Sequence, residues 1–292
     1  MEPLLLACLL LVSSARAGDA LRQTQERVQA LKRLPQVPSA DAPSPGGGLR
    51  LEENVDSPYW ILLDIPTQRF AVRVVTAKKV MKHTSWARLP DMAAGEPTAV
   101  AGMNGGYFGG TPALPVGLLV ADGKDVYSEP VDPAGKETLN AVFFVRADGS
   151  ADIAPLSEFL ELRRKGGSSI VSAVIGKSKG DSANEASRDE RAAVCTKPGH
   201  VMMVLAKSQT LEGMGALLKN AGCEKFVHLD GGGSSQMFVR AGASPAIKPF
   251  EMGWERKNLA DGAECSPPRD SYAPTCFRRV MDFLLVVPLG AE

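Results

Sequence analysis

The sequence predicts an α+β protein, with a mostly antiparallel or mixed β-sheet core and two or three packed helices in a single domain. Short apolar segments bounded by Gly, Pro, Asp and Asn recur along most of the chain, a pattern typical of strands joined by turns. Only a few segments space their apolar residues as a helix does. With 292 residues, 44% of them hydrophobic, the chain can bury a sizeable core.

Residues 1–17 have the features of a secretory signal peptide. A short apolar segment, Leu4 to Val12, precedes Ala15-Arg16-Ala17, which is a small-x-small cleavage pattern. We therefore expect a secreted or periplasmic protein. Lipid anchoring at Cys8 is the alternative, but too few residues precede this cysteine to form both the first region and the apolar region of a signal peptide.

The segment at 18–48 is expected to form a short helix and a linker. Apolar residues follow a helical spacing from Asp19, a candidate N-cap, to Leu34. The following residues, "PQVPSADAPSPGGG", have the composition of a linker. We expect the folded domain to span residues 49–292.

The first half of this domain is predicted to consist mainly of strands. The segment "PYWILLDIPTQRFAVRVV" predicts a hairpin of two strands joined by the turn "PTQR". A strand from Ala99 to Met103 leads into the glycine-rich loop "NGGYFGG". Two further hairpins are expected to turn at Asp122-Gly123 and at Asp148-Gly149, dipeptides that favour tight hairpin turns.

The second half adds helices to further strands. The segment "LSEFLELRRKG" predicts a short helix capped by Ser157, and "TLEGMGALLKNAG" predicts an amphipathic helix ended by Gly222. The predicted strands are "RAAVCT" and "HVMMVLA" around the turn "KPG", "KFVHL" and "QMFV" around three glycines, and a final "RRVMDFLLVVP".

Four cysteines remain after removal of the signal peptide, and export favours disulfides between them. Cys265 and Cys276 bracket a proline-rich loop, so we expect them to pair with each other. Cys195 would then pair with Cys223, although two buried free thiols are an equal alternative because their flanking residues are apolar. No CxxC motif is present, which argues against a structural zinc site.

Two glycine-rich loops are the strongest functional signals. The segments "AGMNGGYFGG" and "HLDGGGSSQM" each follow a strand, and their glycines are led by Asn104 and Asp230. Glycines leave backbone N–H groups open to anionic oxygens, and two such loops in one chain favour a shared site over two simple turns. Gly176-Lys177-Ser178 resembles the end of a P-loop but lacks its first glycine, so we assign no nucleotide site there.

The two loops, an Arg-x-Ala strand at Arg191 and an Arg-x-Val strand near the C-terminus together resemble the phosphodiester glycosidase family. The resemblance covers about Tyr59 to Pro288, with the elements in the same order. It implies a hydrolase that cleaves the glycosidic bond of a sugar-1-phosphodiester and releases free sugar and a phosphate monoester. The chain departs from the family at Glu190, Ala192 and His228, where proline, threonine and asparagine are usual.

The resemblance implies catalytic roles for Asp230, Arg191 and Asn104. Asp230 would activate water or stabilise an oxocarbenium-like carbon, and Arg191 would bind phosphate. The late arginine of the site is Arg278, or Arg279 beside it. The expected substrate-binding residues are Gly105, Gly106, Tyr107, His228, Gly231, Gly232, Gly233, Ser234 and Arg278.

The expected partner is a sugar phosphodiester or a phosphorylated glycan. The net charge of zero argues against nucleic-acid binding, and after the first residues no apolar run is long enough to span a membrane. We expect no cofactor, and a metal ion between His228 and Asp230 is the less favoured use of that pair. The rival function is a non-catalytic envelope protein that binds phosphorylated glycans on the same fold.

Overall fold

The computed structural model describes residues 48–54, 59–109, 114–128, 139–166, 169–178, 187–240, 247–251 and 278–290. All of them belong to one compact unit, Pro43–Glu292. The predicted signal peptide, the helix and linker before residue 48, and the Cys265–Cys276 pair lie outside the described residues. Within these described ranges, no helix has the length and apolar character needed to cross a membrane.

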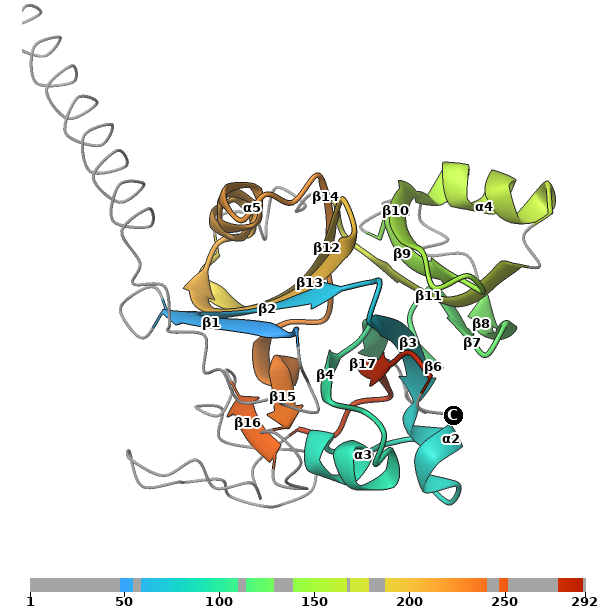
Figure 1. The fold of residues 1–292 in the computed structure, drawn as a ribbon, viewed down its shortest axis with the longest axis horizontal. Coiled ribbons are helices and arrows are strands. Elements are labelled where there is room, and N and C mark those ends of the chain that lie inside the picture. The colour runs from blue at the N-terminus through green and yellow to red at the C-terminus, as the bar shows by residue number, and fades with distance from the viewer. Residues whose placement is uncertain are drawn as a thin grey trace, which may run out of the picture. The chain divides into compact units, whose positions relative to one another are not determined.

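Three five-stranded sheets form the fold, and every pairing within them is antiparallel (Figure 1). In pairing order, the first sheet contains β1 (Arg50–Asn54), β2 (Trp60–Pro66), β13 (His200–Gln209), β12 (Asp189–Lys197) and β14 (Lys225–His228). The second contains β10 (Ala151–Pro155), β9 (Ala141–Arg146), β11 (Ile170–Gly176), β7 (Leu118–Ala121) and β8 (Lys124–Ser128). The third contains β16 (Ile247–Glu251), β15 (Gln236–Arg240), β4 (Ala101–Asn104), β17 (Asp282–Pro288) and β3 (Phe70–Thr76).

A two-stranded sheet and short helices complete the described fold. β5 (Phe108–Gly109) pairs with β6 (Leu114–Pro115). The helices are α2 (Ala77–Met81), α3 (Leu89–Gly95), α4 (Leu156–Arg164), α5 (Leu211–Asn220) and the 3-10 turn η2 (Gly232–Ser234). Sheets of antiparallel strands with a few helices beside them confirm the predicted α+β class.

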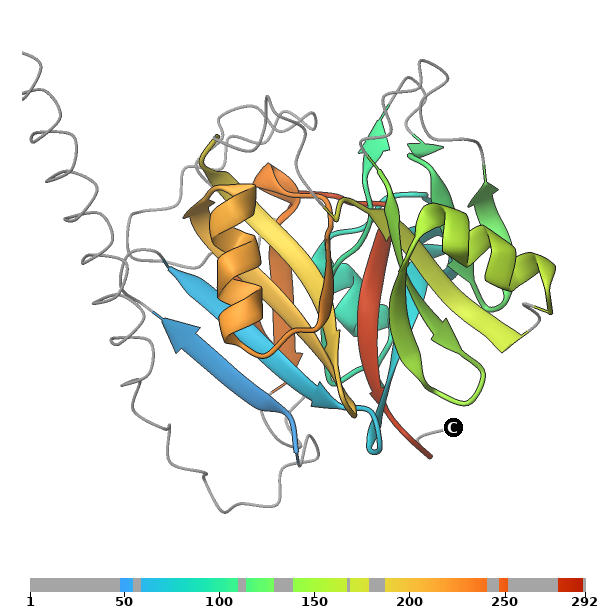
Figure 2. The same ribbon diagram turned by 90° about the horizontal axis from the view of Figure 1, so that it is seen from above.

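Apolar side chains from all three sheets meet in one buried cluster. Ile61 of β2, Phe143 of β9 and Leu284 of β17 are among its members. Helix α5 packs over β12, β13 and β14, α4 packs on β9 and β10, and α3 packs on β4 and β15 (Figure 2). The sheets therefore share this cluster, and further buried clusters lie where α3 and α4 cover faces that would otherwise be exposed.

Most predicted elements are found near their expected positions. The hairpins at Asp122-Gly123 and Asp148-Gly149 form, and the φ angles of Gly123 and Gly149 are 72° and 83°. Helix α5 ends before Gly222, whose φ is 86°, as expected of a glycine that stops a helix. The strand predicted from Ala99 to Met103 is displaced by one or two residues, to Ala101–Asn104.

Two expectations about local structure are wrong. β2 and β3 are joined by the predicted turn, but they do not form a hairpin, because β2 pairs with β13 in the first sheet and β3 pairs with β17 in the third. Ser157 does not cap α4, since the cap position is Pro155 and no side chain bonds to the first turn. Proline fixes a backbone angle suited to the start of a helix, so the helix begins without a hydroxyl cap.

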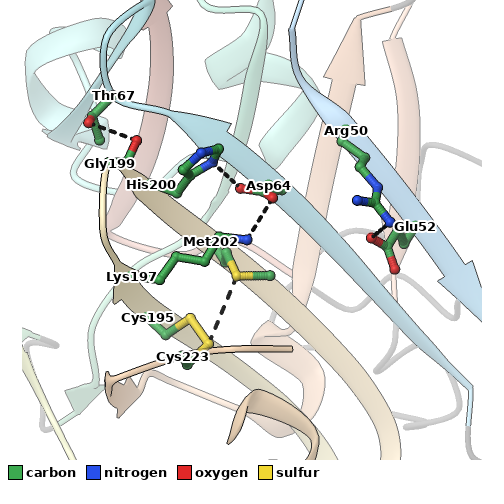
Figure 3. A network of polar contacts seen from close by, with 10 residues as sticks. All are labelled: Arg50, Glu52, Asp64, Thr67, Cys195, Lys197, Gly199, His200, Met202 and Cys223. Atoms are coloured by element: carbon green, nitrogen blue, oxygen red, sulfur yellow. Dashed lines mark hydrogen bonds and ion pairs between the residues drawn. A yellow bond between two sulfur atoms is a disulfide. The ribbon is translucent and has the colours of Figure 1, made fainter. Parts of the chain in front are cut away.

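Cys195 of β12 and Cys223, which follows α5, form a disulfide and confirm that predicted pair (Figure 3). In the same part of the first sheet, the Asp64 carboxylate lies 2.8 Å from Lys197 Nζ and 2.7 Å from His200 Nδ1 (Figure 3). These contacts join β2, β12 and β13 and tie the end of α5 to the sheet. A disulfide of this kind is typical of proteins that fold in an oxidising compartment.

Candidate active site

The two glycine-rich loops lie against each other where the first and third sheets adjoin. β4 ends at Asn104, and Asp230 follows the end of β14 by two residues. The Asp230 N–H donates to the Gly105 carbonyl at 3.2 Å, and the Leu229 N–H donates to the Ala192 carbonyl at 2.9 Å. The second loop is thus held between the first loop on one side and β12 on the other.

Asn104 links the beginning and the end of the second loop. Its side-chain nitrogen donates to the Asp230 carbonyl at 2.8 Å, and its Oδ1 accepts the Gln236 N–H at 3.1 Å. The residue is fully buried, so these hydrogen bonds are directed at the protein and not at solvent. The geometry therefore makes Asn104 a residue that positions the main chain of Asp230.

Asp282, the first residue of β17, lies beneath the first loop. Its Oδ1 accepts the Gly106 N–H at 2.7 Å, and its carbonyl accepts the Gly105 N–H at 2.9 Å. A Cβ at Gly105 would lie 1.8 Å from Asp282 Oδ1, so only glycine fits there. This carboxyl was not among the residues that the sequence indicated.

Asp230 is the carboxyl at the centre of the site, and its pKa is raised to about 6. Burial is the main cause, and it outweighs the opposite effects of the Ser234 hydroxyl, the Arg278 guanidinium and the Gly231 N–H, while Asp189 adds a small raising effect. The residue as a whole keeps part of its surface accessible. A partly accessible carboxyl with such a pKa is ionised at pH 7 and is still a useful base.

The glycines of the second loop are required because its main chain lies so close to β12. A Cβ at Gly231 would lie 2.7 Å from the Glu190 carbonyl, and Gly232 has a φ of 56°. From Gly232 the chain turns through η2, and the Ser234 and Ser235 N–H groups donate to the carbonyls of Gly231 and Gly232, each at 3.1 Å. The loop can therefore pass directly beside β12 only because it carries no side chains here.

Unpaired polar atoms gather at this place. Among the described residues, five buried side-chain atoms have no hydrogen-bond partner of good geometry, and four belong to the site: His228 Nδ1, Ser234 Oγ, Ser235 Oγ and Asp282 Oδ2. The Ser234 hydroxyl is near enough to lower the pKa of Asp230 but is not well aligned with it. Buried polar groups normally find partners, so these four atoms are open to hydrogen bonds from water or a ligand.

His228 and Lys177 join the first sheet to the second. The Lys177 N–H donates to the His228 carbonyl at 3.0 Å, and the His228 N–H donates to the Lys177 carbonyl at 2.8 Å. A Cβ at Gly176 would lie 2.2 Å from the same His228 carbonyl, so this approach also requires glycine. The segment that resembles part of a P-loop therefore brings the Lys177 ammonium to the site, 5.4 Å from the centre of the Tyr107 ring.

The His228 side chain is buried and is kept neutral. Its pKa is lowered to about 4, first by burial and then by the positive charges of Arg191 and Lys177. A neutral imidazole in this position can donate or accept one hydrogen bond without adding charge. The two cations that act on it lie on β12 and directly after β11, so positive charge surrounds the loop from both sheets.

Arg191 lies on β12, beside Gly231, whose Cβ position is 3.9 Å from the Arg191 Cα. Its Nε donates to the Gln209 carbonyl at 3.0 Å, and its Nη2 donates to the carbonyl and the hydroxyl of Ser187 at 2.8 and 3.2 Å. The guanidinium is thus anchored by main-chain oxygens, which fix its direction. The main chain of Arg191 therefore lies beside the loop that carries Asp230, while its guanidinium bonds to Gln209 and Ser187.

Arg278, rather than Arg279, is the late arginine whose charge acts on Asp230. Its guanidinium lies 5.1 Å from the centre of the Phe108 ring, and that ring meets Trp86 edge-on at 5.1 Å. The Arg278 carbonyl accepts from Gln236 Nε2 at 3.0 Å, which ties this end of the chain to the second loop. Tyr107 and Phe108 thereby place aromatic rings under two cations of the site.

Two cavities formed by described residues lie away from Asp230. One of about 760 Å³ is lined by residues of α4, β10 and β14, including Leu156, Leu160 and Phe226. The other, of about 580 Å³, lies beside the Asp148-Gly149 turn. Neither of these two cavities contains the groups described above.

The described residues thus define an α+β protein of three five-stranded antiparallel sheets and one two-stranded sheet, with a polar, cation-rich site where the larger sheets adjoin. The family model for phosphodiester glycosidases matches residues 97–284, which is more than half of the chain. The chain belongs to the phosphodiester glycosidase family.

A solved structure of a phosphodiester glycosidase has a similar fold. The catalytic domain of zebrafish N-acetylglucosamine-1-phosphodiester α-N-acetylglucosaminidase, auto-inhibited by its pro-peptide, aligns with a TM-score of 0.57 and 18% identity, over 82% of this chain and 82% of that chain. A hypothetical protein from Synechocystis aligns with a TM-score of 0.49 and 12% identity, over 82% of this chain and 61% of that chain. No curated protein sequence matches this chain.

Proposed function

We propose that this protein is an exported hydrolase that cleaves the glycosidic bond of a sugar-1-phosphodiester. The observation that supports this most strongly is Asp230, a carboxyl with a pKa of about 6 on which the Arg278 cation acts, two residues from His228, on which the cations Arg191 and Lys177 act. The carboxyl suits chemistry at a sugar carbon, and the cations suit an anionic phosphate. Membership of the phosphodiester glycosidase family supports the same reaction class.

In the proposed reaction, water attacks the anomeric carbon while the bond from that carbon to the phosphate oxygen breaks. The electron pair of this bond stays with the phosphate, and a proton of the water goes to the Asp230 carboxylate. A phosphate monoester is a weak base, so its departure needs little help from a general acid, unlike ordinary glycosides. The products are the free sugar and a phosphate monoester, and Asp230 then returns its proton to solvent.

Export is part of the proposal. It is supported by the Cys195–Cys223 disulfide and by the signal-peptide features of residues 1–17. Sequencing the N-terminus of the mature protein tests it, and cleavage after Ala17 is the expected result. A lipid-modified Cys8 would show that the protein is anchored and not released.

The variant Asp230→Asn tests the reaction, because it keeps the shape of the side chain but removes the base. With UDP-N-acetylglucosamine and p-nitrophenyl-type sugar phosphodiesters as substrates, kcat/KM should fall by about 100-fold or more. The unfolding temperature at pH 7 should be equal to or above that of the wild type, since a buried charge is removed. Asp152→Asn, at a carboxylate paired with Lys225 away from the site, is the matched control and should keep full activity.

A wild type that turns over no sugar phosphodiester would refute the enzymatic proposal. Equal rates for the wild type and Asp230→Asn would remove Asp230 from the mechanism. If the inactive wild type still bound phosphorylated glycans, and Lys177→Gln weakened that binding, the rival function of a glycan-phosphate binding protein would replace the proposal.

A further inference from the structure

Asp282 is a second carboxyl of the site, and neither glycine-rich motif contains it. It is 1% exposed and begins β17, which pairs with β4 on one side and with β3 on the other. Isolated charges are rarely buried so completely in an apolar strand. The burial of Asp282 therefore points to a specific role for this carboxyl.

The contacts of Asp282 lead directly to Asp230. Oδ1 and the carbonyl of Asp282 accept the N–H groups of Gly106 and Gly105. The Gly105 carbonyl in turn accepts the Asp230 N–H, and the Asn104 side chain holds the Asp230 carbonyl. Through these hydrogen bonds, Asp282 holds Gly105 and Gly106 in place. Gly105 and Asn104 in turn hold the N–H and the carbonyl of Asp230.

Its hydrogen bonding suits a neutral carboxylic acid. Oδ1 has one N–H donor, while Oδ2 has no partner of good geometry among the described residues. A carboxylate with so few donors would be poorly stabilised in a buried position. Burial raises the pKa of Asp282 to about 7, against the lowering effect of the Gly106 N–H, and the negative charge of Asp230 raises it further.

Asp230 and Asp282 differ in the charged groups that act on them. Asp230 is the charged group that acts on Asp282. Asp230 itself is acted on by Arg278, which lowers its pKa, and by Asp189, which raises it. Positive charge thus stabilises ionised Asp230, whereas among the residues that the structure describes no cation acts on Asp282, so in this pair Asp230 is the carboxyl that ionises first.

We propose that Asp282 is a positioning residue for hydrolysis at Asp230: in its neutral form it holds Gly105 and Gly106 against Asp230, and in its ionised form it places a second negative charge behind the site that repels the anionic substrate. This inference rests on the proposed function of Asp230. Hydrolysis should therefore be efficient only over a limited range of pH. Ionisation of Asp230 sets the lower limit, and ionisation of Asp282 sets the upper limit.

The variant Asp282→Asn separates the two effects. Asparagine keeps an oxygen for the Gly106 N–H and cannot ionise, so it imitates the neutral acid. In the wild type, KM for a sugar phosphodiester should rise by roughly tenfold as the pH increases from 6.5 to 8.5, with little change in kcat, because two like charges now face the phosphate. In Asp282→Asn this rise should vanish, while the loss of activity on the acid side should stay in place.

Asp64→Asn is the matched control, because Asp64 is a buried carboxylate of the first sheet that pairs with Lys197 and His200 (Figure 3). It should keep the wild-type rise in KM at alkaline pH. An unchanged rise in Asp282→Asn would overturn the proposal. A rise that vanished equally in both variants would overturn it as well, because the effect would then not belong to Asp282.

Two further measurements need no substrate and distinguish failure of this inference from failure of the proposed function. The pKa of Asp282 is raised in the folded protein, so the wild type should lose stability relative to Asp282→Asn as the pH rises from about 4 to 7. Carboxyl NMR of Asp-labelled protein should show the Asp282 midpoint move to lower pH in Asp230→Asn, which removes the neighbouring charge. A pH-independent stability difference or an unmoved midpoint would refute the role of Asp282, even if the enzyme is active. If the wild type is inactive but both effects are present, only the proposed reaction is refuted.

Discussion

Asn104 and Asp230, 126 residues apart in the sequence, are joined by a 2.8 Å hydrogen bond from the Asn104 side-chain nitrogen to the Asp230 carbonyl. The bond acts on the main chain of Asp230 and leaves its carboxyl to face the site. The other end of the same amide holds the Gln236 N–H. The two glycine-rich motifs are therefore one structural unit, in which the first loop supports the second.

Replacement of this amide should weaken both the fold and the reaction. Asn104→Ala leaves the Gln236 N–H and the Asp230 carbonyl buried without partners, so the free energy of unfolding should fall by about 1–3 kcal/mol. Urea unfolding at pH 7 measures this change, and kcat/KM should fall with it. Asn104→Asp keeps the acceptor for Gln236 but loses the donor to the Asp230 carbonyl and buries a charge beside Asp230, so it should impair both stability and activity. A stable and fully active Asn104→Ala would contradict the positioning role.

The stability of the protein at acid pH should depend on the buried His228 side chain. The pKa of His228 is lowered from 6.5 to about 4, so its contribution to stability is complete above about pH 6.5 and is lost as the pH falls toward 4. Compared with His228→Asn, the wild type should lose about 3 kcal/mol over this range. Chemical unfolding at several pH values gives the two curves. Parallel curves would show that His228 does not titrate as described.

Lys177 should contribute to substrate binding and not to folding. In Lys177→Gln, KM for a sugar phosphodiester should rise by about tenfold, because one positive charge near the phosphate is lost, and added salt should reduce the difference. Lys177→Arg should retain most of the binding. Lys225→Gln, which removes a lysine paired with Asp152, is the control and should leave KM unchanged. A normal KM in Lys177→Gln would exclude the lysine from the substrate site.

The Cys195–Cys223 disulfide should stabilise the first sheet. The cysteines are 28 residues apart, and closing a loop of that length contributes about 3–4 kcal/mol by restricting the unfolded chain. The double variant Cys195→Ser/Cys223→Ser should therefore unfold at a lower temperature, whereas Met202→Leu, which keeps the disulfide, should not. Non-reducing peptide mapping should recover this pair, and it also tests the predicted Cys265–Cys276 pair.

The sequence predicts the fold class and the centre of the site because both depend on local patterns. Asp230 and Asn104 stand beside glycines whose spacing is visible in the chain, and Cys195 and Cys223 are the pair left once Cys265 and Cys276 are assigned. Which strands pair with each other is harder to predict from the sequence. The turn between β2 and β3 predicts that two strands follow each other, but which sheet each strand joins depends on β13 and β17, far away in the sequence.

Asp282 and Lys177 show the limit of local patterns more sharply. A single aspartate before an apolar strand looks like any strand end, and its role depends on Gly106, 176 residues earlier. Lys177 belongs to a segment that resembles an incomplete nucleotide-binding motif, and its role depends on the bridge to His228. Contacts of this range carry no signal in one sequence alone, since nothing nearby in the chain distinguishes these residues from ordinary polar ones.

The place of β17 in the third sheet has a consequence for how this protein is made. The strand is made after the other strands of the third sheet, yet it lies between β4 and β3 and supplies Asp282 to the loops. The third sheet cannot close, and the site cannot form, until residues 282–288 have been made. A chain that terminates before residue 282 should therefore be an unfolded product without partial activity, and a peptide that competes for the gap between β4 and β3 should trap the newly made chain before it matures.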